Sequence, residues 1–320
     1  MYHPFRWLLG LRRKEPKLKT IRELAKTLDA GRLIGDSEDI PHFDVRDLYT
    51  ENAPSKLFGY YSANGVRYAL ETLGIFKLLE TQGFRDFKVE VTGYDAWTQL
   101  LRVWGHNGGR SLLLTEGRFR RSSWIVPSET PLLKSECRNH LFDVAFIDWM
   151  TLQNPLAEFT AERPRLPGQQ YPGLGIVHEV MEVFYAVARR LHLDALLAVS
   201  DRFHNAVIYS PSFFFVDPRR QAELVAIERA GAGHSLQDMA LALEAGLLYR
   251  DRSEPYVWHG DLMINPLEVE IQEAHRRSGY VEKVEEMSRG LDFEFDWPVF
   301  EDRRTAIRES KEWGQPETIY

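Results

Sequence analysis

Leu166-Pro-Gly-Gln-Gln-Tyr-Pro-Gly-Leu-Gly-Ile176 is the stretch of sequence on which the fold prediction rests. It is rich in Gly and Pro, and it separates an apolar segment, 141–150, from a segment with helical apolar spacing, 176–191. Glycines can take positive φ, and the first amides of a helix lack intrahelical partners and carry the positive end of its dipole. We therefore expect a strand, a loop and a helix start that together suit a phosphate or pyrophosphate group.

The pattern on both sides of this loop predicts a sheet with helices docked on it. An apolar strand is expected at 193–199 and a short helix at 205–209. Upstream, helices are expected near 19–28 and from Gly65 to Leu79, with strands at 87–91, 97–103, 112–119 and 141–150. Beyond Pro218 the expected helices are 221–229, 236–244 and 267–287, with extended segments between 247 and 264.

These elements suggest three parts. They are an N-terminal extension at 1–55, an α/β domain at 56–217 and a mainly helical C-terminal subdomain at 218–320. The 44% hydrophobic and 27% charged content is ordinary for a soluble globular protein, and the net charge of −7 disfavours nucleic acid as a partner. There is one cysteine, Cys137, and no apolar run approaches the length of a membrane span. We expect a cytoplasmic protein that does not use a membrane.

Two motifs carry a resemblance to a known family. Gln170-x-x-Gly173-x-Gly175 resembles the Gln/Arg-x-x-Gly-x-Gly/Ala signature of the GNAT acyltransferase superfamily. The segment Asn205 to Phe213, which begins 30 residues after Gly175, is similar to that superfamily's Asn-x-x-Ala-x-x-x-Tyr-x-x-x-Gly-Phe region. The resemblance is strongest over 143–216. It implies a GNAT-like α/β (α+β) fold, a mixed central sheet flanked by helices, with the N-terminal extension and helical C-terminal addition attached.

The resemblance also implies an activity, transfer of an acetyl or other acyl group from acyl-coenzyme A to a primary amine, with no metal. The acceptor would be a small-molecule or peptide amine. Tyr209 would be the general acid that protonates the departing thiolate. The residues implied to bind the cofactor are Gln170, Tyr171, Gly173, Leu174, Gly175, Ile176 and Asn205.

A base must also remove a proton from the attacking amine. Asp148 lies within the apolar 141–150 segment, where desolvation would raise the pKa of a carboxyl group, and it is our first candidate. Glu116, on a neighbouring expected strand, is the second. Each of them is also explained by a side chain that points to solvent from a half-buried strand.

Departures from the family pattern keep two alternatives open. Pro172 removes a backbone N–H from the loop, and Ser212 stands where the family has Gly. The first alternative is a non-catalytic coenzyme-A-binding or scaffold protein with a GNAT-like fold. The second is a transferase that uses aminoacyl-tRNA or acyl carrier protein as donor, with Arg118, Arg120 and Arg121 as a local basic groove. Acceptor identity, acyl chain length and oligomeric state, a homodimer among the options, stay open.

Three further signals are interpreted as structural. His259-Gly-Asp261 is similar to a kinase catalytic loop, but without a Asp-Phe-Gly motif downstream we interpret it as a polar turn. His178-Glu179 lacks a second His four residues on, so no zinc helix is expected. His204 is interpreted as a structural or solvated histidine rather than a catalytic one.

Overall fold

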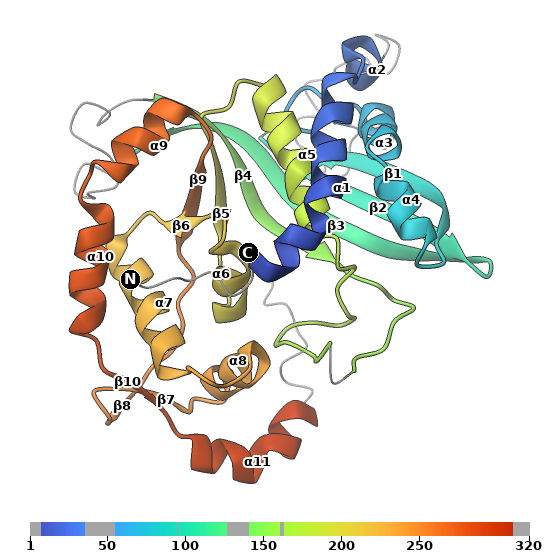
Figure 1. Ribbon diagram of the computed structural model, residues 1–320. Helices are drawn as coiled ribbons and strands as arrows, with labels where there is room; N and C mark the ends of the chain where they lie inside the picture. The colour runs from blue at the N-terminus through green and yellow to red at the C-terminus, as the bar shows by residue number, and fades with distance from the viewer. Residues whose placement is uncertain (1–7, 36–54, 96, 127–140, 161–162, 310–320) are drawn as a thin grey trace. The chain divides into compact units, whose positions relative to one another are not determined.

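The computed structural model describes residues 8–35, 55–95, 97–126, 141–160 and 163–309. These residues form a seven-stranded mixed sheet of strand order β1-β2-β3-β4-β5-β9-β6 and a three-stranded sheet of order β10-β7-β8. Helices flank the larger sheet (Figure 1). The mixed α/β architecture expected from the sequence is therefore confirmed. Cys137 and the end of the N-terminal extension, 36–54, lie outside the described residues.

Four helices precede the first four strands, and helices and strands are mixed after β4. The strands are β1 Arg85–Gly93, β2 Thr98–Asn107, β3 Arg110–Ile125, β4 Leu141–Leu152, β5 Ala195–Val199, β6 Phe214–Phe215, β7 Leu248–Arg250, β8 Glu254–Pro255, β9 Leu262–Pro266 and β10 Phe293–Phe295. The helices are α1 Leu8–Lys26, α2 Ala30–Ile34, α3 Ala63–Thr72, α4 Ile75–Glu80, α5 Val177–Arg190, α6 Phe203–Tyr209, α7 Pro218–Ala230, α8 Leu236–Glu244, α9 Val269–Arg276, α10 Tyr280–Arg289 and α11 Trp297–Glu309. Among them, no helix has the length and apolar content to cross a membrane.

The chain divides into two compact units, and neither is continuous in sequence. The N-terminal unit comprises Met1–Ser123, Asp143–Pro155 and Gly173–Leu196. The C-terminal unit comprises Trp124–Phe142, Leu156–Pro172 and Leu197–Tyr320. The N-terminal unit thus takes α1 and α2 from the expected extension together with the first strands of the sheet.

In the N-terminal unit, β1, β2 and β3 form an antiparallel meander. The β2–β3 turn is Gly108-Gly109, and both glycines have positive φ, as a two-residue hairpin turn of type I′ requires. Helices α1, α3, α4 and α5 lie over one face of these strands (Figure 1). Helix α1 is longer than the predicted 19–28, and Arg22 ties it to α5 through both oxygens of Glu182, at 2.7 and 2.9 Å.

The C-terminal unit packs its helices through charged and backbone contacts as well as an apolar core. Helix α7 reaches the end of α10, where Arg229 donates to the carbonyl of Ser288 at 2.7 Å. Helices α8 and α11 meet at Asp238, whose carboxylate oxygens accept from Arg304 at 3.0 Å and Arg308 at 2.9 Å. The Tyr280 hydroxyl donates to the carbonyl of Phe215 in β6.

Two segments were each predicted to form one continuous helix, and this was wrong. Each segment forms two helices, and a glycine with positive φ lies at each break. The segment 65–79 forms α3 and α4 because Gly74 takes φ +76° between them. The segment 267–287 forms α9 and α10, divided at Gly279 with φ +77°. Left-handed backbone ends a helix, and glycine adopts it without steric cost. The apolar spacing continued across both breaks, so periodicity alone did not reveal them.

Gly65 is a position where the fold should tolerate no side chain. A Cβ there would lie 1.9 Å from the carbonyl oxygen of Leu33, which accepts the backbone N–H of Ser62. We predict that Gly65→Ala lowers the free energy of unfolding by about 1–3 kcal/mol, since backbone has to move to relieve the clash. Urea denaturation followed by circular dichroism measures this.

Gly290→Ala is the matched control for that substitution. Gly290 has φ −83°, and an added Cβ would meet its nearest atom at 3.5 Å, an ordinary contact. It should change stability by no more than about 0.5 kcal/mol. Equal effects of the two substitutions would contradict the close approach of Leu33 to Gly65.

Candidate functional site

The segment that decided the fold prediction lies in a strand–loop–helix–strand unit formed by β4, α5 and β5. Asp194, directly before β5, donates its backbone N–H to the carbonyl of Asp143 at 2.8 Å. Its carboxylate accepts the N–H of Asp143 at 2.8 Å. Asp143 is near the start of β4, so the two neighbouring strands begin at the same end and run parallel. The loop and the start of α5 follow the opposite, carboxyl end of β4.

The residues predicted to bind the cofactor differ in exposure and in the unit to which they belong. Gln170 and Tyr171 are exposed and fall in the C-terminal unit, whereas the residues from Gly173 onward belong to the N-terminal unit. Gly173 pairs with Gln153 in an isolated β-bridge, and a Cβ on it would meet only the Leu152 carbonyl oxygen, at 3.6 Å. Glycine is therefore not required there for steric reasons within the protein.

In the second half of the loop, one backbone amide is already hydrogen-bonded within the protein. The N–H of Leu174 donates to the Leu152 carbonyl at 3.3 Å, so this amide is not free for a phosphate. Gly175 is exposed and has φ +70°, as the sequence suggested for a glycine at this turn. Ile176 is buried, with 5% of its surface exposed. An anion at this loop would thus meet Gly175 and the helix start rather than the whole predicted set.

The start of α5 has the features of an anion-binding helix end, but its first turn also carries an acidic residue, Glu179. Ile176 is the N-cap residue and has no side-chain oxygen to cap the first turn. Glu179, in that first turn, is 3% exposed. Its carboxyl group already places acidic character at the positive end of the dipole. A bound phosphate would share this end with Glu179.

Asp148 and Glu116 lie on one face of the sheet in a network of charges. Register pairs Arg102 with Glu116 and Leu100 with Arg118, so these side chains share a face. The guanidinium of Arg102 donates to Glu116 Oε1 at 2.6 Å. Both oxygens of Asp148 are engaged, Oδ2 by Arg118 at 3.1 Å and Oδ1 by Arg120 at 3.2 Å. Asp148 is thus held between two cations.

The arginines proposed as a basic groove are all paired. Arg118 and Arg120 contact Asp148, and Arg121 makes a bidentate contact with Asp143. The three guanidinium groups thus share the two carboxylates of Asp148 and Asp143, which cancel most of their charge. This arrangement adds little local positive charge for a nucleic-acid phosphate.

Strand β4 changes the face that it presents between Asp148 and Met150. Residues two apart on a regular strand share a face. Asp148 contacts arginines on the charged face, whereas Met150 lines a cavity together with Leu101 and Thr115, on the opposite face. This break in alternation is what a β-bulge produces, and bulges release backbone groups from the ladder.

Tyr209 and Asn205 lie on α6 in the C-terminal unit. Burial, reinforced by the negative charge of Asp201, raises the pKa of Tyr209. The hydroxyl therefore stays protonated at neutral pH, as a general acid must. Asp148, Glu116 and the start of α5 belong to the other unit, so neither unit by itself contains both the candidate acid and the candidate bases.

His204, next to Asn205, is a buried histidine. It is 4% exposed, and burial, together with the positive charge of Arg202, lowers its pKa to about 3. The guanidinium of Arg202 is itself paired with Glu244 at 2.6 Å. A neutral imidazole inside the unit fits the structural role expected from the sequence.

The His259-Gly-Asp261 segment, interpreted from the sequence as a polar turn, makes ordinary local contacts. Gly260 packs against Asp201, because a Cβ on it would lie 2.9 Å from the Asp201 Cα. Asp261 accepts the N–H of Leu262 at 2.6 Å and lies 3.6 Å from Arg220. In the part of the chain that the structure describes, no three His, Cys, Asp or Glu side chains gather as a metal site would require.

Sequence reasoning missed one feature, an apolar cavity in the N-terminal unit. It is lined by residues of β2, β3, β4, α3, α4 and α5, and by Ile176 of the predicted cofactor loop. Each lining residue taken alone has the pattern of an ordinary core residue. No signal in a single segment distinguishes a wall of a cavity from a packed core.

The pH dependence of stability tests the state of His204. Its folded-state pKa is depressed from about 6.5, so the unfolded chain binds the proton first as the pH falls. The contribution of neutral His204 to stability is therefore present above pH 6.5 and is lost as the pH falls towards 3. We predict that His204→Gln removes about 1–3 kcal/mol of the stability that the protein loses between pH 6.5 and 4.5. Urea denaturation at a series of pH values measures it.

His259→Gln is the control, because His259 is an exposed histidine in the same unit. The acid destabilisation of this variant should match that of the unchanged protein. If His204→Gln also shows the full loss of stability on acidification, the imidazole of His204 is accessible to protons and the buried neutral state is wrong.

Comparison with known proteins leaves the family as a prediction. The fold shown by the structure is a mixed sheet flanked by helices, in which β4 and β5 are parallel neighbours joined through α5. The likeness to GNAT acyltransferases rests on the motifs within 143–216. No protein-family model and no curated protein matches this chain.

Proposed function

We propose that this protein is a GNAT-like N-acyltransferase that transfers an acyl group from acyl-coenzyme A to a primary amine. The observation that carries the proposal is the β4–loop–α5–β5 unit. Two parallel neighbouring strands are joined by a loop with Gly175 at positive φ and by a helix whose first turn has no side-chain cap. Backbone amides at such a helix start favour a phosphate or pyrophosphate group.

The reaction needs one bond formed, one broken and two protons moved. The amine nitrogen bonds to the thioester carbonyl carbon, the carbon–sulfur bond breaks, and the amine proton goes to a base while the thiolate takes a proton from an acid. Tyr209 suits the acid role because its hydroxyl stays protonated. We propose that backbone N–H groups at the break in alternation of β4 after Asp148 stabilise the oxyanion, because a bulge frees backbone groups from the ladder.

The two candidate bases differ in how many of their carboxylate oxygens accept hydrogen bonds. Asp148 accepts a guanidinium hydrogen bond on each oxygen, so it is engaged in holding Arg118 and Arg120. Glu116 is bonded through Oε1 to Arg102. Among the described residues nothing donates to its second oxygen, Oε2. The geometry therefore favours Glu116 over Asp148 as the group that accepts a proton.

Coenzyme A binding at the loop is tested at Gly173. The space beside Gly173 admits a Cβ at ordinary contact distance, so Gly173→Ala should bind coenzyme A as the unchanged protein does. Gly173→Glu adds a carboxylate beside the proposed anion site, and charge repulsion should abolish detectable binding. Titration calorimetry with free coenzyme A measures both variants, and circular dichroism checks that each is folded.

The pair of variants separates repulsion from a general disturbance of the loop. Binding that is unchanged in Gly173→Glu places coenzyme A elsewhere. An absence of binding in the unchanged protein contradicts the proposed function itself.

The role of Tyr209 is tested by turnover on a panel of primary amines. Loss of the hydroxyl in Tyr209→Phe should lower kcat by about 10²–10⁴-fold, with little effect on KM for the acyl donor, because a general acid acts in the transition state. Tyr249→Phe, on β7 of the same unit, is the control and should keep its activity. A kcat within about threefold of the unchanged protein would remove Tyr209 from the mechanism.

A non-catalytic coenzyme-A-binding protein is the second candidate. One observation favours it: both oxygens of Asp148, the first candidate base, accept guanidinium hydrogen bonds from Arg118 and Arg120. This candidate predicts that coenzyme A binds and that no amine of the panel is acylated.

A further inference from the structure

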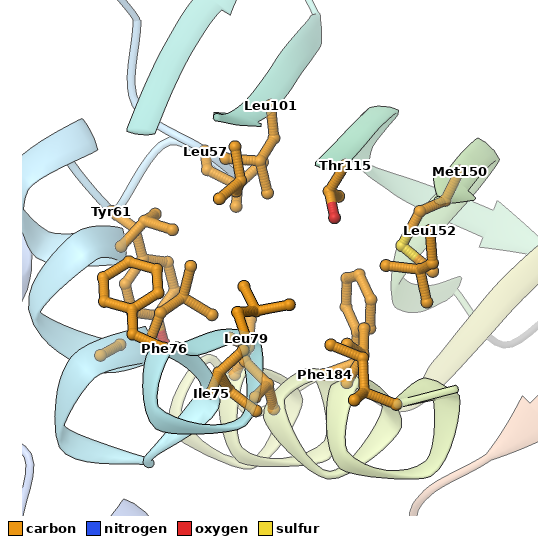
Figure 2. Close-up of a pocket in the computed structure, with 18 of the residues that line it drawn as sticks. Leu57, Tyr61, Ile75, Phe76, Leu79, Leu101, Thr115, Met150, Leu152 and Phe184 are labelled. Atoms are coloured by element: carbon orange, nitrogen blue, oxygen red, sulfur yellow. The ribbon is translucent and has the colours of Figure 1, made fainter. Parts of the chain in front are cut away.

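The charged face of β2, β3 and β4 carries two arginines that converge on one carboxylate. On the opposite face of these strands, Leu101 and Thr115 project towards the apolar cavity (Figure 2). Arg118 and Arg120, two residues apart on β3, share the charged face with Asp148 of β4. Their side chains are 22% and 42% exposed, so solvent reaches both guanidinium groups.

Each of these two guanidinium groups uses one of its three nitrogens within the protein. The Nε of Arg118 donates to Asp148 Oδ2 at 3.1 Å, and the Nε of Arg120 donates to Oδ1 at 3.2 Å. Within the described ranges, the terminal nitrogens Nη1 and Nη2 of both side chains make no hydrogen bond to the protein. A guanidinium binds a carboxylate through two parallel N–H···O bonds, and its terminal nitrogens suffice for this. The pair therefore has donors available for a further oxyanion.

Aromatic rings restrain both guanidinium groups. Arg118 Cζ lies 5.1 Å from the centre of the Tyr94 ring, and Arg120 Cζ lies 4.1 Å from the centre of the Phe146 ring. A planar cation that is stacked on a ring and paired with a carboxylate has little rotamer freedom left to lose when a ligand binds. The donors of Arg118 and Arg120 are therefore preorganised.

The charges on and beside this face suit an anion with a single charge. Three cations are matched by three carboxylates, and they are Arg102, Arg118 and Arg120 with Glu116, Asp148 and Asp95. Because there is no excess of cations, the additional charges of a phosphate dianion or a nucleic acid gain nothing here and cost additional dehydration. A carboxylate carries one charge, and its two oxygens match the geometry of a guanidinium.

The donors also lie beside the carboxylate to which the proposed function assigns the amine proton. Glu116 is two residues from Arg118 on the same strand and the same face, about 7 Å along β3. We infer that the acyl acceptor is an amino acid or another small amine that carries a carboxylate, and that Arg118 and Arg120 bind this carboxylate while the amine meets Glu116. The identification of the ligand as the acceptor rests on the proposed function, whereas the carboxylate site is testable without it.

The first test compares turnover of matched amines with acetyl-coenzyme A as donor. The pairs differ only in the carboxylate: glycine and methylamine, β-alanine and ethylamine, γ-aminobutyrate and propylamine. In at least one pair kcat/KM should be about 10²-fold higher for the amino acid, because each of two hydrogen bonds between ionised groups contributes about tenfold. Equal values within every pair would overturn the inference and leave the proposed function standing.

Variants at the two arginines locate the carboxylate. Arg118→Gln and Arg120→Gln should each raise KM for the preferred amino acid by about tenfold and leave KM for its matched amine unchanged. Arg121→Gln is the control and should keep the preference, because Arg121 already uses Nε and Nη2 on Asp143. If circular dichroism shows that a glutamine variant does not fold, Arg120→Lys, which keeps the charge but lacks the fork, replaces it. A full preference in folded variants overturns the site.

Direct binding separates this inference from the proposed function. Saturation-transfer NMR of the three amino acids is measured with the full chain, with and without coenzyme A. A signal that is lost in Arg118→Gln and Arg120→Gln and kept in Arg121→Gln supports the carboxylate site, even if no amine is acylated, in which case the proposed function and the acceptor role fall. No signal from any of the three with the unchanged protein overturns the inference, whether or not simple amines are acylated.

Discussion

The apolar face of β2, β3 and β4 has to be covered, and in the N-terminal unit α3, α4 and α5 cover it. Helix α5 is the central element in this layer. Phe184 packs against Phe119 of β3 at a ring distance of 5.5 Å, and Glu182 holds α1 through Arg22. Because α5 is fixed in this way, its first turn is fixed as well. The proposed anion site therefore depends on the packing of α5 against the sheet and α1.

Side chains alternate between the two faces of these strands, so charged residues lie on one face and cavity-lining residues on the other. On one face Arg102, Glu116, Arg118 and Asp148 form ion pairs, and on the other Leu101 and Thr115 line the cavity. Regular alternation keeps these faces apart. Strand β4 departs from it between Asp148 and Met150, so a strand that carries a charged residue on one face supplies the cavity wall two residues later.

The secondary structure of the region around the loop could be predicted well, for a physical reason. The segments 141–150, 176–191 and 193–199 have the apolar periods of a strand, a helix and a buried strand, and they form β4, α5 and β5. Gly175 takes the positive φ expected of it. The errors at Gly74 and Gly279 arose because apolar spacing continues through a glycine whose φ only the packed chain sets.

The sequence by itself determined the strand–loop–helix–strand order of β4, α5 and β5 and the glycine at its turn, because these follow from local backbone preference and periodicity. The tertiary structure alone decided which partners the carboxylates take, since the pairing of Asp148 with Arg118 and Arg120 depends on strand register. It alone decided the cavity too. Residues from Leu57 to Val187 line it, and an empty volume depends on how separate segments fail to fill the space between them rather than on any one of them.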